Sequence, residues 1–249
     1  MTLKQMATAA AVVAALSIAS LAHAQQAAAP PAAGGKADAV AALKQSLQQG
    51  LAKAKQYEWV ETTIISLKGE EKARKQNRCY YGADGKVQKI PIDQPAAQEK
   101  PQAGRGGRRG GALKEKIVEN KKDEMQEYMG KAAALVHSYV PPDPAKIQAA
   151  KDAGRVKATP QAGGAVSVAI SDYLQPGDAL TIGLDQAAGK LLSLAVDSYL
   201  DKKEDTVTLD VKMNTLADGA LYAAETKLDA KAKNITVVIQ NTGHRPLQK

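Results

Sequence analysis

The sequence predicts an α+β fold: a large curved antiparallel sheet, forming an unclosed barrel, with helices covering its inner face. Two groups of strand-like residues, 57–92 and 165–240, flank a stretch of helical periodicity. In the second group apolar and polar side chains alternate, which indicates that one sheet face is buried and the other meets water. Short turn signals separate these strands, so we expect sequential antiparallel neighbours rather than parallel strands joined by helices.

The first 24 residues follow the order of a secretory signal peptide. Lys4 provides the basic start, an apolar run over residues 6–21 follows, and Ala22-His23-Ala24 places small residues at the cleavage-site positions. The alternative is a membrane anchor, which needs about 20 strongly apolar residues. This run is short, rich in alanine and interrupted by two serines. We therefore expect cleavage after Ala24 and export of the mature chain to the periplasm.

One α+β domain is expected over residues 37–249. It follows a lead-in, residues 25–36, whose Ala, Pro, Gln and Gly residues predict disorder. Apolar residues at steps of three and four then predict a first helix from Asp38 to about Tyr57.

Three strands are expected after this helix. Residues 57–67 are rich in β-branched and aromatic side chains, which is typical of a strand. A turn near Lys68 leads to a polar partner strand ending at Tyr81. Ala83-Asp84-Gly85-Lys86 is a tight-turn signature, so residues 87–92 are expected to form the third strand.

The middle of the chain is expected to hold a mobile loop and a helical insertion. Residues 95–112 consist mainly of Gln, Pro, Gly, Ala and Arg and offer almost nothing to a core. The insertion, residues 113–154, contains a long helix that ends before Pro141 and a shorter one from about Pro144 to Ala153.

The chain after Ala165 is expected to be a meander, which brings the total to eight or nine strands. The alternating apolar positions of this meander are expected to face inward: Val166, Val168, Ile170, Leu180, Ile182, Leu184, Val207, Leu209, Val211, Met213, Ile235, Val237 and Ile239.

Charge and cysteine content restrict the partners. The formal charge is +8, with 34 basic and 26 acidic residues. In an exported protein this excess fits lipid headgroups, anionic glycans or an acidic protein rather than nucleic acid. The single cysteine, Cys79, cannot form an internal disulfide. We expect it to be a small buried side chain in a strand, with an intermolecular disulfide or a reactive thiol as alternatives.

No pattern in the sequence predicts a catalytic residue, a metal site or a cofactor. Two histidines follow the signal segment, His137 and His244, and neither belongs to an HxxxH, HExxH or Cys/His cluster. A Gly-x-Ser-x-Gly elbow and the GxxxxGK[ST] phosphate loop are also absent from the sequence.

Two features are candidates for binding. The arginines of the 95–112 loop, Arg105, Arg108 and Arg109, could bind phosphates or carboxylates through bidentate hydrogen bonds. The alternative is a solvated connector. Trp59 could flank an apolar cleft between the sheet and the helices. The alternative is a filled core in which Trp59 is packing.

The order of elements carries a resemblance to a known group. An export signal and a first helix precede a Trp59-bearing strand and an Asp84-Gly85-Lys86 turn, and a helical insertion then leads to a meander that includes residues 184–192. This layout is similar to that of the periplasmic lipoprotein carriers (the LolA/LolB-like group). The resemblance implies an unclosed barrel that is covered by helices and holds lipid tails, and it transfers no individual lipid-binding residue.

We therefore expect a non-enzymatic periplasmic binding or carrier module for an apolar or lipidic ligand, such as a lipid or acyl chain. It would be peripheral to the membrane at most, with anionic headgroups as a further contact. The alternatives are a structural or interaction protein of the cell envelope with a filled core, bound to another envelope protein, and an enzyme of unrecognised type.

Overall fold

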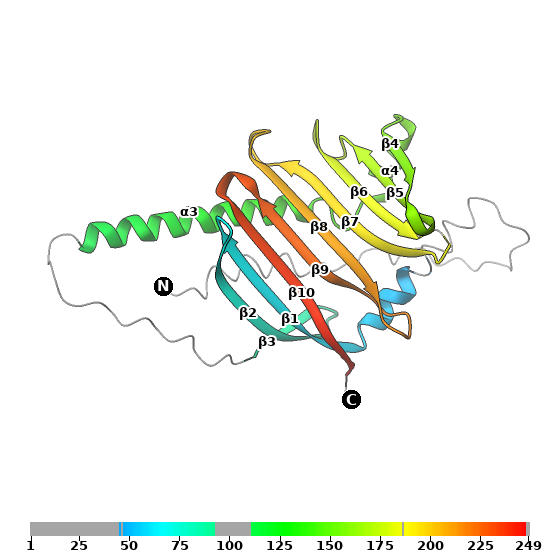
Figure 1. Cartoon of the computed structure of the whole chain (residues 1–249), viewed down its shortest axis with the longest axis horizontal. Coiled ribbons are helices and arrows are strands. Elements are labelled where there is room, and N and C mark those ends of the chain that lie inside the picture. The colour runs from blue at the N-terminus through cyan, green and yellow to red at the C-terminus, as the bar shows by residue number, and fades with distance from the viewer. Residues whose placement is uncertain (1–44, 46, 93–110, 186, 248–249) are drawn as a thin grey trace, which may run out of the picture.

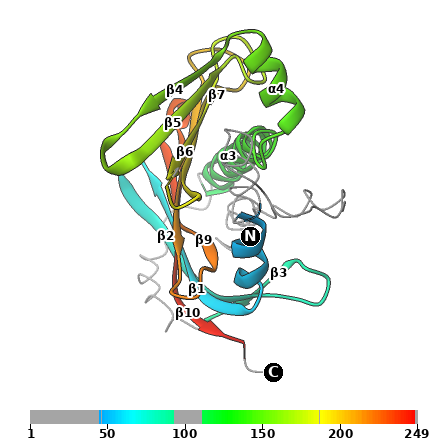
Figure 2. The same cartoon turned by 90° about the vertical axis from the view of Figure 1, so that its right-hand side faces the viewer.

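The structure is a computed structural model that describes residues 45, 47–92, 111–185 and 187–247, with the backbone alone for 111–122. Its described part contains one ten-stranded antiparallel sheet with the helices on one side (Figures 1 and 2). The α-helices are a segment over residues 47–54, α3 (Gly111–His137) and α4 (Pro144–Asp152). The strands are β1 (Tyr57–Leu67), β2 (Glu70–Tyr81), β3 (Val87–Pro91), β4 (Val156–Pro160), β5 (Ala165–Ser171), β6 (Ala179–Asp185), β7 (Lys190–Tyr199), β8 (Thr206–Thr215), β9 (Leu221–Ala230) and β10 (Ile235–Pro246).

The strand order is β3-β2-β1-β10-β9-β8-β7-β6-β5-β4. Because β1 pairs with β10, the three N-terminal strands continue the meander that the C-terminal strands form. The sheet curves around α3 and the 47–54 helix without closing, and β3 and β4 are its two edges (Figure 2). The predicted fold class is confirmed.

Several elements differ from the sequence prediction, including the last strand, which continues beyond residue 240 to Pro246. The edge strand β4 was not predicted, because it has only five residues and four of them are exposed, which leaves no apolar alternation. The described residues therefore contain ten strands rather than eight or nine. The long helix begins at Gly111 instead of residue 113. The first helix ends at residue 54 because Tyr57 already starts β1.

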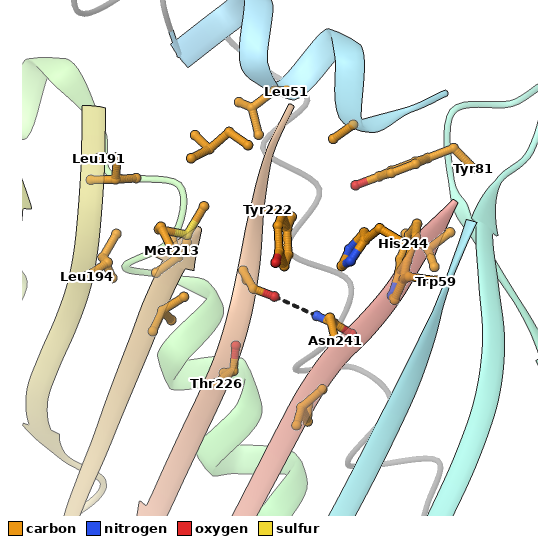
Figure 3. A pocket seen from close by; sticks show the side chains of 17 residues that line it. Leu51, Trp59, Tyr81, Leu191, Leu194, Met213, Tyr222, Thr226, Asn241 and His244 are labelled. Atoms are coloured by element: carbon orange, nitrogen blue, oxygen red, sulfur yellow. Dashed lines mark hydrogen bonds between the residues drawn. The ribbon is translucent and has the colours of Figure 1, made fainter. Parts of the chain in front are cut away.

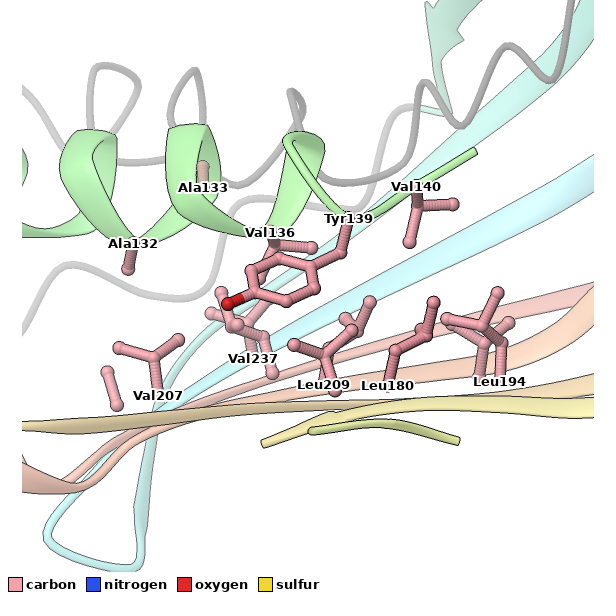
Figure 4. Close-up of a cluster of buried hydrophobic side chains, with 14 of the residues drawn as sticks. Ala132, Ala133, Val136, Tyr139, Val140, Leu180, Leu194, Val207, Leu209 and Val237 are labelled. Atoms are coloured by element: carbon pink, nitrogen blue, oxygen red, sulfur yellow. The ribbon is translucent and has the colours of Figure 1, made fainter. Parts of the chain in front are cut away.

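The core lies between the second half of α3 and the centre of the sheet (Figure 4). Leu209 of β8 and Leu228 of β9 form a cross-strand pair, and both are completely buried. Ala132 and Val136 of α3, together with Tyr139 just after the helix, cover this layer from above. The prediction that alternating apolar side chains face inward is confirmed for cross-strand pairs such as Ile170 and Leu180, which are both completely buried.

A buried carboxylate joins the end of α3 to the β5–β6 connection. Asp178 is 2% exposed and accepts hydrogen bonds from the backbone N–H groups of residues 173, 174 and 175. The Tyr139 hydroxyl also donates to Asp178 and lies 2.7 Å from the Ser198 hydroxyl. Every one of these groups is satisfied by another, so the α3 terminus, the β5–β6 turn and β7 are held as one unit.

Several predicted segments lie outside the described residues. These are the signal peptide over 1–24, the lead-in over 25–36 and most of the 95–112 loop. The expectations about them stay predictions. Among the helical residues that the structure describes, no helix combines the length and the apolar character needed to cross a bilayer.

Candidate functional site

The 47–54 helix packs against the end of the β8–β9 hairpin. A Cβ atom on Gly50 would lie 2.8 Å from the Leu221 Cβ, so glycine is required where the helix meets the strand. On the same side of the helix, the Lys53 ammonium donates to the carbonyl of Asp218 in the hairpin turn. These contacts hold the helix over one end of the sheet, where it forms a wall of a cavity.

The sheet divides beneath this helix. The β9–β10 ladder runs from Ile235 opposite Ala230 to Gln240 opposite Glu225 and ends there. In contrast, β8 and β9 stay paired to Leu221, and β1 and β10 stay paired to Pro246. Figure 3 shows β9 and β10 diverging at this point. The side-chain amide of Asn241 bridges the gap by donating to the Ala223 carbonyl at 2.8 Å.

A β-bulge places His244 on the inner face of the sheet. Val60 pairs with Thr242 and Glu58 pairs with Arg245, so Gly243 and His244 together oppose Trp59. Gly243 has φ +62°, the left-handed conformation that such a bulge needs. Strict alternation would put His244 on the same face as Thr242. The extra residue instead turns the imidazole toward Trp59.

The result is a cavity of about 90 Å³ at the inner face, between the sheet, the 47–54 helix and Val140 in the segment after α3 (Figure 3). Its walls are mainly apolar. They are formed by Leu51, Ala54, Trp59, Tyr81, Val87, Val140, Leu191, Leu194, Val211, Met213, Leu221, Tyr222, Ala223, Thr226, Ile239, Asn241 and His244.

Aromatic rings form one end of this cavity. The Trp59 and His244 rings are stacked, with centroids 6.0 Å apart and an interplanar angle of 15°. Tyr222 packs on the other side of His244 at 3.9 Å, and Tyr81 packs against Trp59 at 5.5 Å. Four side chains from β1, β2, β9 and β10 thus share one contact network.

The cavity wall carries no formal charge near neutral pH. Its residues include no Asp, Glu, Lys or Arg. Burial lowers the pKa of His244, so its imidazole is neutral, and burial raises the pKa of the Tyr81 hydroxyl. The buried carboxylate of Glu61, the cross-strand partner of Asn241, is bound to Lys89, whose ammonium lies 2.8 Å from both carboxylate oxygens.

Cys79 lies beside this ion pair rather than in the cavity. It is opposite Trp59 on one side and Lys89 on the other, and it is completely buried. Burial, followed by the nearby Glu61 carboxylate, raises the pKa of the thiol to about 12. A thiol of this kind is a packing side chain rather than a nucleophile, as the sequence suggested.

Of the four predicted site residues, the structure places Trp59 at the cavity. Arg105, Arg108 and Arg109 lie outside the described residues, so anion binding by their loop stays a prediction. Sequence analysis did not predict Asn241 or Tyr222, and it identified His244 only as a residue that belongs to no metal-binding motif. Gly243 within a strand pattern was the one available signal, because such a glycine often marks a bulge that redirects its neighbour.

No metal centre is formed by the described part of the chain, in which no three His, Cys, Asp or Glu side chains come together. An apolar cavity with a few polar atoms is suited to binding a small or slender ligand.

Comparisons with known proteins add one structural likeness. No protein-family model matches the chain, and no curated protein sequence matches it. The chain is similar to the crystal structure of a DUF1329 family protein from Desulfovibrio piger ATCC 29098, with a TM-score of 0.40 and 12% sequence identity. The match covers 84% of this chain and 92% of that one. A likeness at this level says nothing about function.

Proposed function

We propose that the protein is a non-enzymatic binding or carrier module that takes an apolar or lipidic ligand into the cavity under the 47–54 helix. One observation carries the proposal: an uncharged, mainly apolar cavity lies on the concave face, between the sheet and the covering helices. Buried space of this kind lowers core stability, because its lining atoms lose packing contacts. A cavity kept beside an aromatic cluster is better explained by a ligand than by packing.

The size of the cavity defines what enters it. An engineered apolar cavity of about 150 Å³ binds benzene. A cavity of about 90 Å³ therefore takes several methylene groups, which is the end of an acyl chain rather than a whole lipid. A longer ligand requires the 47–54 helix to move away from Leu221, against which Gly50 packs.

The predicted export signal supports a role in the periplasm, where apolar molecules need a protein to cross water. Helices on the concave face of an unclosed sheet also match the layout that resemblance to the lipoprotein carriers implies. In this proposal the apolar ligand occupies the cavity, and the arginines at positions 105, 108 and 109 contact anionic headgroups.

Native mass spectrometry of the exported protein tests the proposal. We expect a co-purified lipid mass on the wild-type chain and its loss in Ala223→Phe, which fills the cavity. The matched control is Ala195→Phe, because Ala195 pairs with the exposed Asp210 on the opposite face. A wild-type protein that carries no lipid would favour the alternative of an envelope interaction protein. A lipid retained by Ala223→Phe would place the ligand elsewhere.

A further inference from the structure

Two polar atoms at the aromatic end of the cavity lack a hydrogen-bond partner. Within the described part of the chain, the indole Nε1 of Trp59 and the carbonyl Oδ1 of Asn241 are buried and unpaired. One is a donor and the other an acceptor. Each buried polar atom without a hydrogen-bond partner lowers the stability of the folded state. Two such atoms side by side therefore indicate that a ligand or a water molecule completes their hydrogen bonds.

Trp59 and Asn241, which carry these two atoms, are neighbours on the inner face of the sheet. Asn241 is directly opposite Glu61, so Trp59, two residues earlier on β1, is its diagonal neighbour on the same face. The amide nitrogen of Asn241 is committed to the Ala223 carbonyl, which must receive a donor, and this leaves the oxygen free. Figure 3 shows the Asn241 and Trp59 side chains next to each other at this end of the cavity.

We propose that the ligand ends in a neutral hydroxyl, which accepts a hydrogen bond from Trp59 Nε1 and donates one to Asn241 Oδ1. This inference rests on the proposed function, because it names the polar end of the apolar ligand. A hydroxyl is the smallest group that both donates and accepts.

Other polar ends fit less well. A carboxylate accepts from Trp59 but brings its charge against the Asn241 oxygen, in a wall that contains no Lys or Arg. An ammonium donates to Asn241 but leaves the indole N–H unpaired. An ether or ester accepts only, so the Asn241 oxygen stays unsatisfied. The competing explanation is a water molecule that bridges both atoms independently of any ligand.

Titration with three probes that each contain six carbon atoms distinguishes these possibilities. They are 1-hexanol, its isomer pentyl methyl ether, and hexanoate. Trp59 is the only tryptophan in the chain, so its fluorescence reports directly on this site. We expect 1-hexanol to bind about tenfold more tightly than the ether, since the ether leaves one buried acceptor unpaired. Hexanoate is expected to bind more weakly than 1-hexanol.

A matched pair of variants assigns the effect to Asn241. In Asn241→Leu the preference for the alcohol over the ether is expected to shrink to about twofold or less. Asn214→Leu is the control, because Asn214 is exposed on β8 outside the cavity, and it should keep the wild-type preference. If Asn241→Leu does not fold, the probe series on the wild-type chain decides alone.

The outcomes distinguish this inference from the proposed function. Equal affinities for the alcohol and the ether, each abolished by Ala223→Phe, would show that water satisfies the two atoms; the inference would then be wrong and the apolar site would stand. Tightest binding of hexanoate would also overturn it. Saturation by none of the probes would overturn the proposed function and this inference together.

Discussion

The buried Asp178 carboxylate offers the sharpest test of how the fold is held together. Its Oδ1 accepts from the Tyr173 N–H at 2.5 Å. Its Oδ2 accepts from the Leu174 N–H at 3.0 Å, from the Gln175 N–H at 2.8 Å and from the Tyr139 hydroxyl. Asp178→Asn keeps the shape of the side chain but converts one acceptor into an NH₂ donor.

Either orientation of the new amide leaves a backbone N–H facing a donor. One unpaired buried donor costs about 1–3 kcal/mol, and the remaining hydrogen bonds lose the strength that a charged acceptor gives them. The neutral amide is easier to bury than a carboxylate, which offsets part of this loss. We therefore expect Asp178→Asn to lower the free energy of unfolding by about 2–4 kcal/mol. In a domain of this size, that is a fall of about 4–16 °C in Tm.

Urea unfolding followed by circular dichroism measures this loss, with Asp152→Asn on the exposed face of α4 as the matched control. The control is expected to stay within about 0.5 kcal/mol of wild type. Tyr139→Phe removes the hydrogen bonds that the same hydroxyl makes to Asp178 and Ser198, so its effect should add to that of Asp178→Asn less than fully. Similar losses for Asp178→Asn and Asp152→Asn would refute the reasoning.

Four further predictions concern other parts of the chain. Leu209→Ala should cost about 2–5 kcal/mol, because Leu209 is completely buried, whereas Thr208→Ala on the opposite face should stay within about 0.5 kcal/mol; equal losses in urea unfolding would mean that the β8 register is wrong. Burial lowers the pKa of His244 in the folded state, so the unfolded chain binds more protons and stability should fall as pH decreases from about 7 through the ordinary histidine pKa; His244→Gln should flatten that part of the pH profile of unfolding. The raised pKa of Cys79, about 12, predicts very slow alkylation by iodoacetamide at about pH 8 in the folded protein and fast alkylation in urea, as followed by intact mass. Neutralising the three arginines of the 95–112 loop should leave Tm unchanged and weaken binding to anionic vesicles, most strongly at low salt, and unchanged vesicle binding at low salt would leave that loop as a connector.

Sequence periodicity was sufficient to predict the strands that bury one face. Val207, Leu209 and Val211 are inward because β8 lies in the middle of the sheet, where α3 covers one side and water the other. A strand with one buried and one solvated face requires apolar and polar residues to alternate, and this alternation is visible in the sequence. The edge strand β4 pairs only with β5 and is exposed at four of its five residues. Its sequence therefore shows no alternation of apolar and polar side chains.

The candidate site was harder to predict because it depends on departures from regular structure. Trp59 could be proposed from its type and its place in a predicted strand. His244 could not, because simple alternation assigns it to the outer face, and only the bulge at Gly243 brings it inside. Asn241 is a polar residue at the end of an apolar alternation, and nothing in the sequence shows that its amide replaces a missing ladder hydrogen bond.

These departures share one physical cause. The β8–β9 register shifts between Lys212 and Met213, and the β1–β10 register shifts at Gly243, close to where the β9–β10 ladder ends. Each extra residue bends its strand and increases the local twist, so two bulges on either side of one ladder drive β9 and β10 apart. Backbone groups along the separated segments then need new partners, and the Asn241 amide supplies one of them. The cavity and its two unpaired polar atoms therefore occur where the ladder hydrogen bonds between β9 and β10 end, and this is the position at which we propose that the ligand binds.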